Sequence, residues 1–578
     1  MTWTVRTAAA CAAFAVLALA GCGGDNSSPV ERRTEFGVVV GENDASTNGT
    51  YNWKGIPFAK APVGDLRWKA PVDPDPWSTR DAKAFGNACV QSGRLYGPGS
   101  NNQYDATIGT TLGQTVGAED CLYLNIWRPS NSASPRPVVV FVHGGSNISG
   151  YTADPVYDGA MLATTANVVV VTVNYRLGIF GFLNQTQLKT GANANDDSGN
   201  FAILDVIKSL QFVQRNIAAF GGDPARVTLM GQSAGAVDIY AVLASPLVVN
   251  ASPALLHRLA PISGGLSLAS ELPPGSLATL SPASAYQAQG NLLLLNMLVA
   301  DGTAADTTAA QAYVATQTNA QIAAYLRSKT PDQLLTTVLT RLAPIGASGS
   351  GPIPEGTVLP ADPVAEIAAG RYLKVPVLAG NTRDEGKLFP TFLALSPALG
   401  GVSGRLLTDA QVFSMAFGYD PNAAPATTVE AWIPAVYLPT NTPVTGFTAR
   451  TELLNQIFFG ASRDHMLNTL KTQQPDVWYY RFDWDEEPAP FNEIYGAAHA
   501  FDLPFLFGNF GPSLLANFVH STANQPGRLA LSDAMMKSLG AFAYNGDPNN
   551  AALGVTWPTW PAKVIFDATP TAKVIVVQ

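Results

Sequence analysis

The pentapeptide GQSAG at Gly231 to Gly235 constrains the fold of this chain more than any other feature. It directly follows the run Val227 to Met230, which is typical of a buried strand, and it leads into the helical run Gly235 to Leu243. Glycines at both ends of such a pentapeptide permit a tight strand-to-helix turn that lifts the serine hydroxyl clear of the sheet. The sequence therefore predicts a strand, turn and helix with Ser233 at the turn.

Short apolar runs alternate with helical patterns from Phe36 to about residue 260, and this alternation predicts the fold class. The strand candidates are Val138 to Val142, Val168 to Val173 and Val227 to Met230, and the helix before the last of them is Leu204 to Ala219. Two strands joined by a crossover helix form a βαβ unit. We therefore expect an α/β protein with a mainly parallel central sheet and helices on both faces.

The second half of the chain adds a helical insertion and further strands. Residues 265 to 350 are rich in Ala, Leu, Thr and Ser, and a stretch such as Ala309 to Leu326 has helical spacing. Strand candidates follow at Val375 to Gly380 and Val477 to Phe482, and a helix is expected around Leu531 to Phe542. No internal repeat or linker is evident, which favours one large domain at residues 34–578.

The N-terminus has the pattern of an export signal. Arg6 precedes the apolar run Thr7 to Ala20, which is shorter than the roughly 20 residues that span a bilayer. Leu19 to Cys22 (LAGC) resembles the bacterial lipobox, which predicts a signal peptide at 1–21, a lipidated Cys22 and a flexible tether at 22–33. Ordinary cleavage after Ala20 is the alternative. The expected location is the cell envelope, on the periplasmic face or outer membrane, or outside the cell after release.

A glycine pair follows the strand Val138 to Val142. The residues are His143, Gly144 and Gly145, at the place where α/β-hydrolases of the esterase and lipase kind build an oxyanion hole from backbone N–H groups. A plain glycine turn after a buried strand is the alternative interpretation, and the GQSAG turn some 90 residues later weakens it.

Motifs along almost the whole mature chain resemble the type-B carboxylesterase family, which includes cholinesterases and bacterial para-nitrobenzyl esterases. The matching segments are GIPFA at 55–59, LRW at 66–68, EDCLYLN at 119–125, VNYR at 173–176, FGGDP at 220–224, DEG at 384–386, FLFG at 505–508 and GDP at 546–548. The resemblance implies an α/β-hydrolase fold and a carboxylic ester hydrolase. It also implies a Ser-His-Glu triad that works through an acyl-enzyme, with Ser233 as the nucleophile.

The resemblance selects the other two triad members. The acid precedes the base in the chain order of this fold. His143 and His257 precede the family's acid, so the base is His465, His499 or His520. His499 stands where the family has its histidine. Glu385 matches the family's acid, with the neighbouring Asp384 as the competitor.

Further site residues follow only from the resemblance. Gly145, Ser146 and Ala234 are implied as the oxyanion hole, and Cys89 and Cys121 as the first disulfide of the family. Two departures bear on specificity. Ser146-Asn147 replaces a small residue and an aromatic, and Gln232 replaces the usual glutamate before the serine.

Charge and composition limit the partners. A net charge of −9 with 34 Lys and Arg argues against nucleic acid as a partner. The expected partner is a small neutral ester, because the loop between the paired cysteines lacks a tryptophan that could bind a choline cation. We expect no cofactor or metal, and membrane contact only through the lipid anchor. Alternatives are a lipase or polyester hydrolase, or an inactive binding module of the same fold. The sequence does not predict the oligomeric state.

Overall fold

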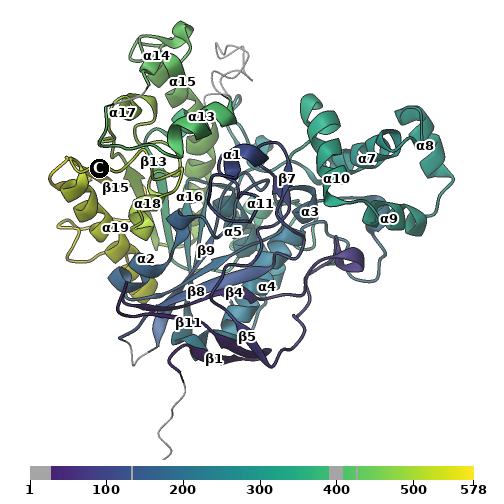
Figure 1. Cartoon of the computed structure of the whole chain (residues 1–578), viewed down its shortest axis with the longest axis horizontal. Coiled ribbons are helices and arrows are strands. Elements are labelled where there is room, and N and C mark those ends of the chain that lie inside the picture. The colour runs from purple at the N-terminus through teal and green to yellow at the C-terminus, as the bar shows by residue number, and fades with distance from the viewer. Residues whose placement is uncertain (1–27, 132–134, 390–407, 425–426) are drawn as a thin grey trace, which may run out of the picture.

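The computed structural model describes residues 28–131, 135–389, 408–424 and 427–578, and a sheet of eleven strands forms its centre (Figure 1). The strand order is β16-β15-β14-β13-β12-β11-β9-β10-β8-β4-β3. Neighbours from β15 to β10 run parallel, and the pairs at both edges are antiparallel. The predicted α/β class with a mainly parallel sheet is confirmed.

The strands of this sheet have the following bounds: β3 Glu42–Asp44, β4 Thr50–Pro57, β8 Tyr123–Pro129, β9 Arg136–Val142, β10 Val169–Val173, β11 Gly222–Gln232, β12 Arg258–Ile262, β13 Val377–Thr382, β14 Val477–Phe482, β15 Val564–Ala568 and β16 Lys573–Val577. Small sheets add β1 Glu31–Thr34, β2 Gly37–Val40, β5 Thr79–Asp81, β6 Gln91–Ser92 and β7 Thr115–Val116.

Part of the predicted tether at 22–33 belongs to a strand. Strand β1 starts at Glu31, inside the tether predicted at 22–33, because Glu31 pairs with Val40 of β2. The indole of Trp53 also donates a hydrogen bond of 2.7 Å to the carbonyl oxygen of Val30. These contacts hold the chain before residue 34. The predicted signal peptide and Cys22 lie outside the described residues.

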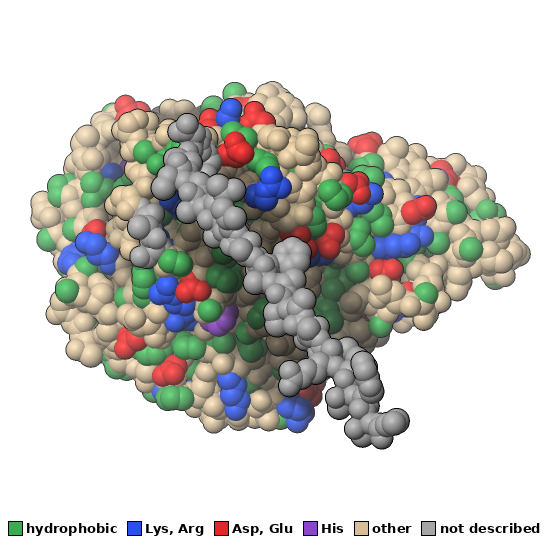
Figure 2. Space-filling model, turned by 90° about the horizontal axis from the view of Figure 1, so that it is seen from below, with side chains coloured by type: hydrophobic (Ala, Val, Ile, Leu, Met, Phe, Trp, Pro, Cys, Tyr) green, Lys and Arg blue, Asp and Glu red, His purple; other side chains and the backbone are tan. Residues whose placement is uncertain are grey.

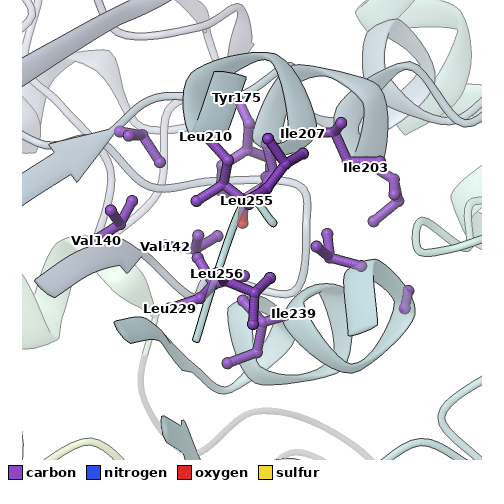
Figure 3. Packing of buried hydrophobic residues seen from close by; sticks show 14 of the residues in the cluster. Val140, Val142, Tyr175, Ile203, Ile207, Leu210, Leu229, Ile239, Leu255 and Leu256 are labelled. Atoms are coloured by element: carbon purple, nitrogen blue, oxygen red, sulfur yellow. The ribbon is translucent and has the colours of Figure 1, made fainter. Parts of the chain in front are cut away.

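Both faces of the sheet are covered by helices, as β9 shows. Val138, Val140 and Val142 pack in one core with the helices α4 and α5, whereas Val139 and Phe141 pack in a second core with α2, α18 and α19. Figure 3 shows side chains of α4, β9 and α5 meeting in the first core. Alternation of this kind places helices on both faces of a parallel sheet.

The helices have the following bounds: α1 Ile108–Thr111, α2 Ala160–Ala166, α3 Gly178–Gly181, α4 Phe201–Asn216, α5 Ala234–Ala244, α6 Pro246–Val249, α7 Ala283–Ala300, α8 Thr307–Ala315, α9 Asn319–Arg327, α10 Pro331–Thr337, α11 Pro363–Ala368, α13 Asp409–Ala416, α14 Val429–Trp432, α15 Phe447–Leu454, α16 Ala461–Gln473, α17 Phe491–Ile494, α18 Leu503–Phe507 and α19 Gln525–Asn545. Within the described ranges, none is long and apolar enough to cross a bilayer.

Helices α7 to α10 form a lobe that projects from the body (Figures 1 and 2). Its side chains Leu293, Leu298, Ile322 and Leu326 are buried in a third core, which the lobe shares with residues of the body such as Trp68 and Phe201. The lobe lies within the predicted helical insertion at 265–350. The stretch that looked like one helix at 309–326 is two, because α9 starts afresh at a capping box whose N-cap residue is Thr318.

Candidate active site

Ser233 occupies a sharp turn between β11 and α5. Its backbone has φ 58° and ψ −122°, a region that a residue with a side chain rarely adopts. Both glycines of the pentapeptide are required by close packing. A Cβ at Gly235 would collide with the carbonyl oxygens of Val142 and His143, and one at Gly231 with the carbonyl of Gly235. The serine is partly exposed at the carboxyl end of its strand.

Glu385 follows β13 and is completely buried. One carboxylate oxygen accepts hydrogen bonds from Asn381 Nδ2 at 3.0 Å and from the N–H of Thr382 at 2.9 Å. The other contacts Nδ1 of His499. Burial acts to raise the pKa of Glu385, but the His499 ring and the donated hydrogen bonds outweigh it and hold the pKa below its usual value. The structure therefore brings together two of the three residues of the predicted triad in direct contact.

Asp384, the alternative acid, has different partners. Its Oδ2 accepts hydrogen bonds from Arg383 Nη2 at 2.7 Å and from the N–H of Ala497 at 3.1 Å, and its Oδ1 lies 3.6 Å from Lys387 Nζ. Its own N–H donates to the carbonyl of Ala497 at 2.9 Å. Asp384 thus ties the loop that carries Glu385 to the loop that carries His499.

The second ring nitrogen of His499 faces Gln232. The distance from Gln232 Nε2 to His499 Nε2 is 3.0 Å, and both side chains are almost fully buried. Gln232 Oε1 lies against Gly144, where a Cβ would have no room. No hydrogen bond between Ser233 Oγ and His499 is present in the described part of the chain. The amide that precedes the serine contacts the nitrogen that a serine proton would have to reach.

Aromatic rings enclose His499, whereas the other candidate histidines lie elsewhere. Its ring centroid is 5.0 Å from that of Phe389 and 5.0 Å from that of Phe459, which lies on a π-helical turn at Asn455–Gly460. His465 is on α16, 4.0 Å from Glu271, and His520 Nδ1 contacts the carbonyl of Ala516. Neither of these contacts involves Ser233 or Glu385.

Residues 143–150 form the loop after β9, which we call the 143–150 loop. The side chain of Ser146 is exposed and that of Asn147 is buried, and both residues have positive φ, 55° and 58°. Gly145 has φ 105°, and its carbonyl accepts hydrogen bonds from Ile148 and Ser149. The N–H of Ala234 lies in the first turn of α5, where a helix leaves N–H groups without an internal acceptor. Strands β9 and β11 are parallel neighbours, so these residues all lie at the carboxyl ends of adjacent strands.

Cys89 and Cys121 are joined by a disulfide, with Cα atoms 4.9 Å apart. Of the two tyrosines in the enclosed loop, Tyr104 packs on Phe417 at 5.3 Å between centroids. Among the described residues, no group of three or more His, Cys, Asp and Glu side chains is arranged to hold a metal ion.

Two buried acids near this site were not predicted. Asp238 on α5 accepts a hydrogen bond of 3.0 Å from Asn147 Nδ2, and burial raises its pKa to about 8. Asp502 accepts one of 2.8 Å from Tyr480, and burial raises its pKa to about 7. The sequence holds a signal for the first, because Asp238 is the single charged residue in the otherwise apolar run Ala234 to Ala244.

Comparison with known proteins adds an independent finding. Residues 28–564 match the model of the carboxylesterase family. The chain is 31% identical to para-nitrobenzyl esterase of Bacillus subtilis over 538 residues, which cover 91% of this chain and 92% of that protein. It is 32% identical to fumonisin B1 esterase of Sphingopyxis macrogoltabida over 535 residues, 92% of this chain and 84% of that protein.

Solved structures agree with the sequence matches. A carboxylesterase of Geobacillus stearothermophilus superposes with a TM-score of 0.67 at 28% identity, covering 95% of this chain and 98% of that one. A structure of PNB esterase superposes with a TM-score of 0.66 at 27% identity, covering 95% and 97%. The likeness confirms the α/β-hydrolase fold that the sequence predicts.

Proposed function

Since the chain belongs to the carboxylesterase family and is a carboxylic ester hydrolase, we propose that Ser233, His499 and Glu385 are its catalytic triad. The observation that carries the proposal is the contact between Glu385 and His499, which lie 114 residues apart in the chain, beside the strained turn of Ser233. A buried carboxylate on one ring nitrogen leaves the other available as a base.

The reaction proceeds in two steps. His499 Nε2 takes the proton of Ser233 while Oγ forms a bond to the ester carbonyl carbon. The alcohol then leaves with that proton, and an acyl-serine remains. Water repeats the sequence, and the carboxylic acid is released. In the resting enzyme Gln232 Nε2 lies 3.0 Å from His499 Nε2. This amide therefore has to move before the serine hydroxyl can donate a hydrogen bond to that nitrogen.

Glu385 orients the imidazole and stabilises its charged form. Its remaining oxygen is held by Asn381 and Thr382, so the carboxylate cannot turn away from the ring. The aromatic rings of Phe389 and Phe459 restrict the imidazole from its sides. The expected result is a base that is positioned before substrate arrives.

Backbone N–H groups of Gly145, Ser146 and Ala234 are proposed to hold the oxyanion. Support comes from the positive φ of the first two residues and from the place of Ala234 in the first turn of α5. Loss of one such donor typically costs about 3–4 kcal/mol of barrier in serine hydrolases.

The proposed substrates are neutral carboxylic esters. The loop between Cys89 and Cys121 has no tryptophan to face a quaternary ammonium, and Gln232 brings no negative charge beside the serine. Phe389 and Phe459 offer apolar surface next to His499. We further propose that Cys22 anchors the enzyme to the cell envelope by lipidation.

The proposal is tested with Ser233→Ala and a matched control, Ser245→Ala, at the opposite end of α5. The first variant should lose turnover of p-nitrophenyl esters and labelling by a fluorophosphonate, while its thermal unfolding stays close to wild type, because this side chain carries little packing. The control should keep both activities. Substantial turnover by Ser233→Ala would point to another nucleophile.

A further inference from the structure

We propose that Asp238 is a positioning residue for the oxyanion hole, which it holds in shape through the side chain of Asn147. The inference rests on the proposed function, since it concerns the loop assigned to oxyanion binding. The structure juxtaposes a buried carboxyl of α5 with the only buried amide side chain of the 143–150 loop. The two residues lie 91 positions apart in the sequence.

The 143–150 loop needs such a support. Ser146 and Asn147 both adopt left-handed backbone conformations although both have side chains. Backbone conformations of this kind are strained and persist only where contacts with the surrounding structure stabilise them, and they are frequent at functional sites. The N–H of Ser146 is directed by these angles, so a relaxed backbone would turn this donor away from the oxyanion.

Asn147 supplies the support through contacts of both its side chain and its backbone carbonyl. Its Nδ2 donates to Asp238 Oδ1 at 3.0 Å, and its Oδ1 accepts from the hydroxyl of Tyr175 at 3.1 Å. Its carbonyl oxygen accepts from the N–H of Gly178 at 2.6 Å and from Ser350 Oγ at 3.0 Å. The side chain cannot rotate without losing the bonds to Asp238 and Tyr175. Asp238 is therefore one of the two partners that hold the side chain of the residue next to Ser146.

The surroundings of Asp238 favour its neutral form. The side chain is fully buried, its Oδ2 has no hydrogen-bond partner, and no Lys, Arg or His in the described ranges forms an ion pair with it. The titratable groups that face it are the hydroxyls of Tyr175 and Tyr286. Burial raises the pKa of both tyrosines, so they stay protonated. A carboxylate here would be a buried charge with a single donor.

Ionisation of Asp238 should therefore disturb the oxyanion hole. Burial raises the pKa of Asp238 to about 8, so the acid is mainly neutral at pH 7 and charged above about pH 9. A carboxylate attracts the amide of Asn147 more strongly than the neutral acid does, because the hydrogen bond from Asn147 favours the charged form. Ionisation should therefore shift Asn147 and, with it, the N–H of the adjacent Ser146. Transition-state stabilisation should fall on the alkaline side while binding of the ester in its ground state changes little.

The test uses Asp238→Asn, Asp238→Ala and Asn147→Gly, with Asp154→Asn as a control at another buried acid. The amide in Asp238→Asn keeps an acceptor for Asn147 and cannot ionise. We expect it to retain kcat at pH 7 within about threefold and to lack the loss of kcat that we expect for wild type between pH 8 and 9.5. Asp238→Ala and Asn147→Gly should lower kcat about tenfold or more with little change in KM, and should weaken inhibition by a trifluoromethyl ketone, which depends on oxyanion binding.

The outcomes separate this inference from the proposed function. If Asp238→Asn keeps the alkaline loss of wild type, or if Asn147→Gly retains full kcat, the positioning role is refuted even though the esterase is active. Because Asp238→Ala can fail through poor folding, the decisive variants are those two, with Asp154→Asn expected to keep the wild-type alkaline profile. Failure of wild type to react with a fluorophosphonate would instead overturn the catalytic assignment itself.

Discussion

The N–H of Ala497 donates a hydrogen bond of 3.1 Å to Asp384 Oδ2, so the residue beside Glu385 holds the loop that carries His499. A reciprocal bond from the N–H of Asp384 to the carbonyl of Ala497 pairs the two loops at 2.9 Å. Two adjacent acids therefore have different tasks. One contacts the imidazole, and the other fixes the distance between the loops.

Glu385→Gln and Asp384→Asn separate these tasks. Glu385→Gln should lower kcat by about 10³- to 10⁴-fold, because the amide no longer stabilises the charged imidazole or its tautomer. Asp384→Asn should mainly lower the free energy of unfolding, by about 1–3 kcal/mol, since it weakens bonds to Arg383 and Ala497. Steady-state kinetics and urea unfolding on both variants measure the difference. The reverse pattern would make Asp384 the acid of the triad.

His499→Ala should reduce kcat as much as loss of the serine, because members of a triad act as a unit. His465→Ala and His520→Ala are the matched controls, and both should stay within about threefold of wild type because their contacts lie outside the site. Hydrolysis of a p-nitrophenyl ester measures all three. A large loss in either control would move the base to that histidine.

Gln232 should contribute to the choice between neutral and cationic esters. We expect kcat/KM for an uncharged butyrate ester to exceed that for butyrylcholine at least tenfold, since a desolvated cation–π contact is worth about 2 kcal/mol and is missing. Gln232→Glu adds a negative charge beside the serine and should narrow the ratio. The two esters should have alcohol leaving groups of similar pKa, so that a difference in rate reflects the charge and not the leaving group. Equal rates for both esters in wild type would contradict the proposed preference.

Asp154 makes stability depend on pH. Burial raises its pKa to about 6. Below about pH 4 the carboxyl is protonated in both the folded and the unfolded chain. Between about pH 4 and 6 the folded chain keeps a proton that the unfolded chain releases, so stability falls as the pH rises. Asp154→Asn keeps the acceptor for the N–H of Val156 and lacks this loss.

The free energy of unfolding of Asp154→Asn should therefore gain about 2–3 kcal/mol on wild type between pH 4 and 7, at about 1.4 kcal/mol for each pKa unit. Urea unfolding at several pH values measures the gain. A constant difference between the two proteins over this range would show that Asp154 does not titrate as described.

Cys22→Ser should turn a detergent-extracted membrane protein into a soluble protein or an uncleaved precursor, because several acyl chains on one cysteine hold firmly whereas a single chain binds marginally. Fractionation of cells that express each form checks this. Wild-type protein found wholly in the soluble periplasm or the medium would refute lipidation.

The sequence predicted the local parts of the site better than its long-range contacts. The turn at Ser233 is set by five consecutive residues, so a strand, two glycines and a helix suffice to predict it. Glu385 and His499 are 114 residues apart, and only the resemblance to a family paired them before the structure did. No periodicity in a sequence relates residues on different loops.

The sequence did not predict the contacts of the residues that differ from the family pattern. Gln232 and Asn147 were recognised as unusual, but their partners His499 and Asp238 lie far away in the chain. Such pairs form only when the carboxyl ends of several parallel strands meet. The start of β1 at Glu31 was missed for a different reason, because this short strand forms by antiparallel pairing with the nearby β2 within the segment interpreted as a tether.

The lobe formed by α7 to α10 is buried in a core distinct from the two cores that flank the sheet, and Trp68, Phe180 and Phe201 of the body contribute to it. Elements with their own core tend to open as cooperative units, and amide hydrogen exchange reports the free energy of each opening. The bond from Ser350 Oγ to the carbonyl of Asn147 joins the chain that returns from the lobe to the 143–150 loop. An opening that breaks this bond removes one of the contacts of Asn147, the residue beside Ser146, so we expect hydrogen exchange in the lobe to be linked to loosening of the 143–150 loop.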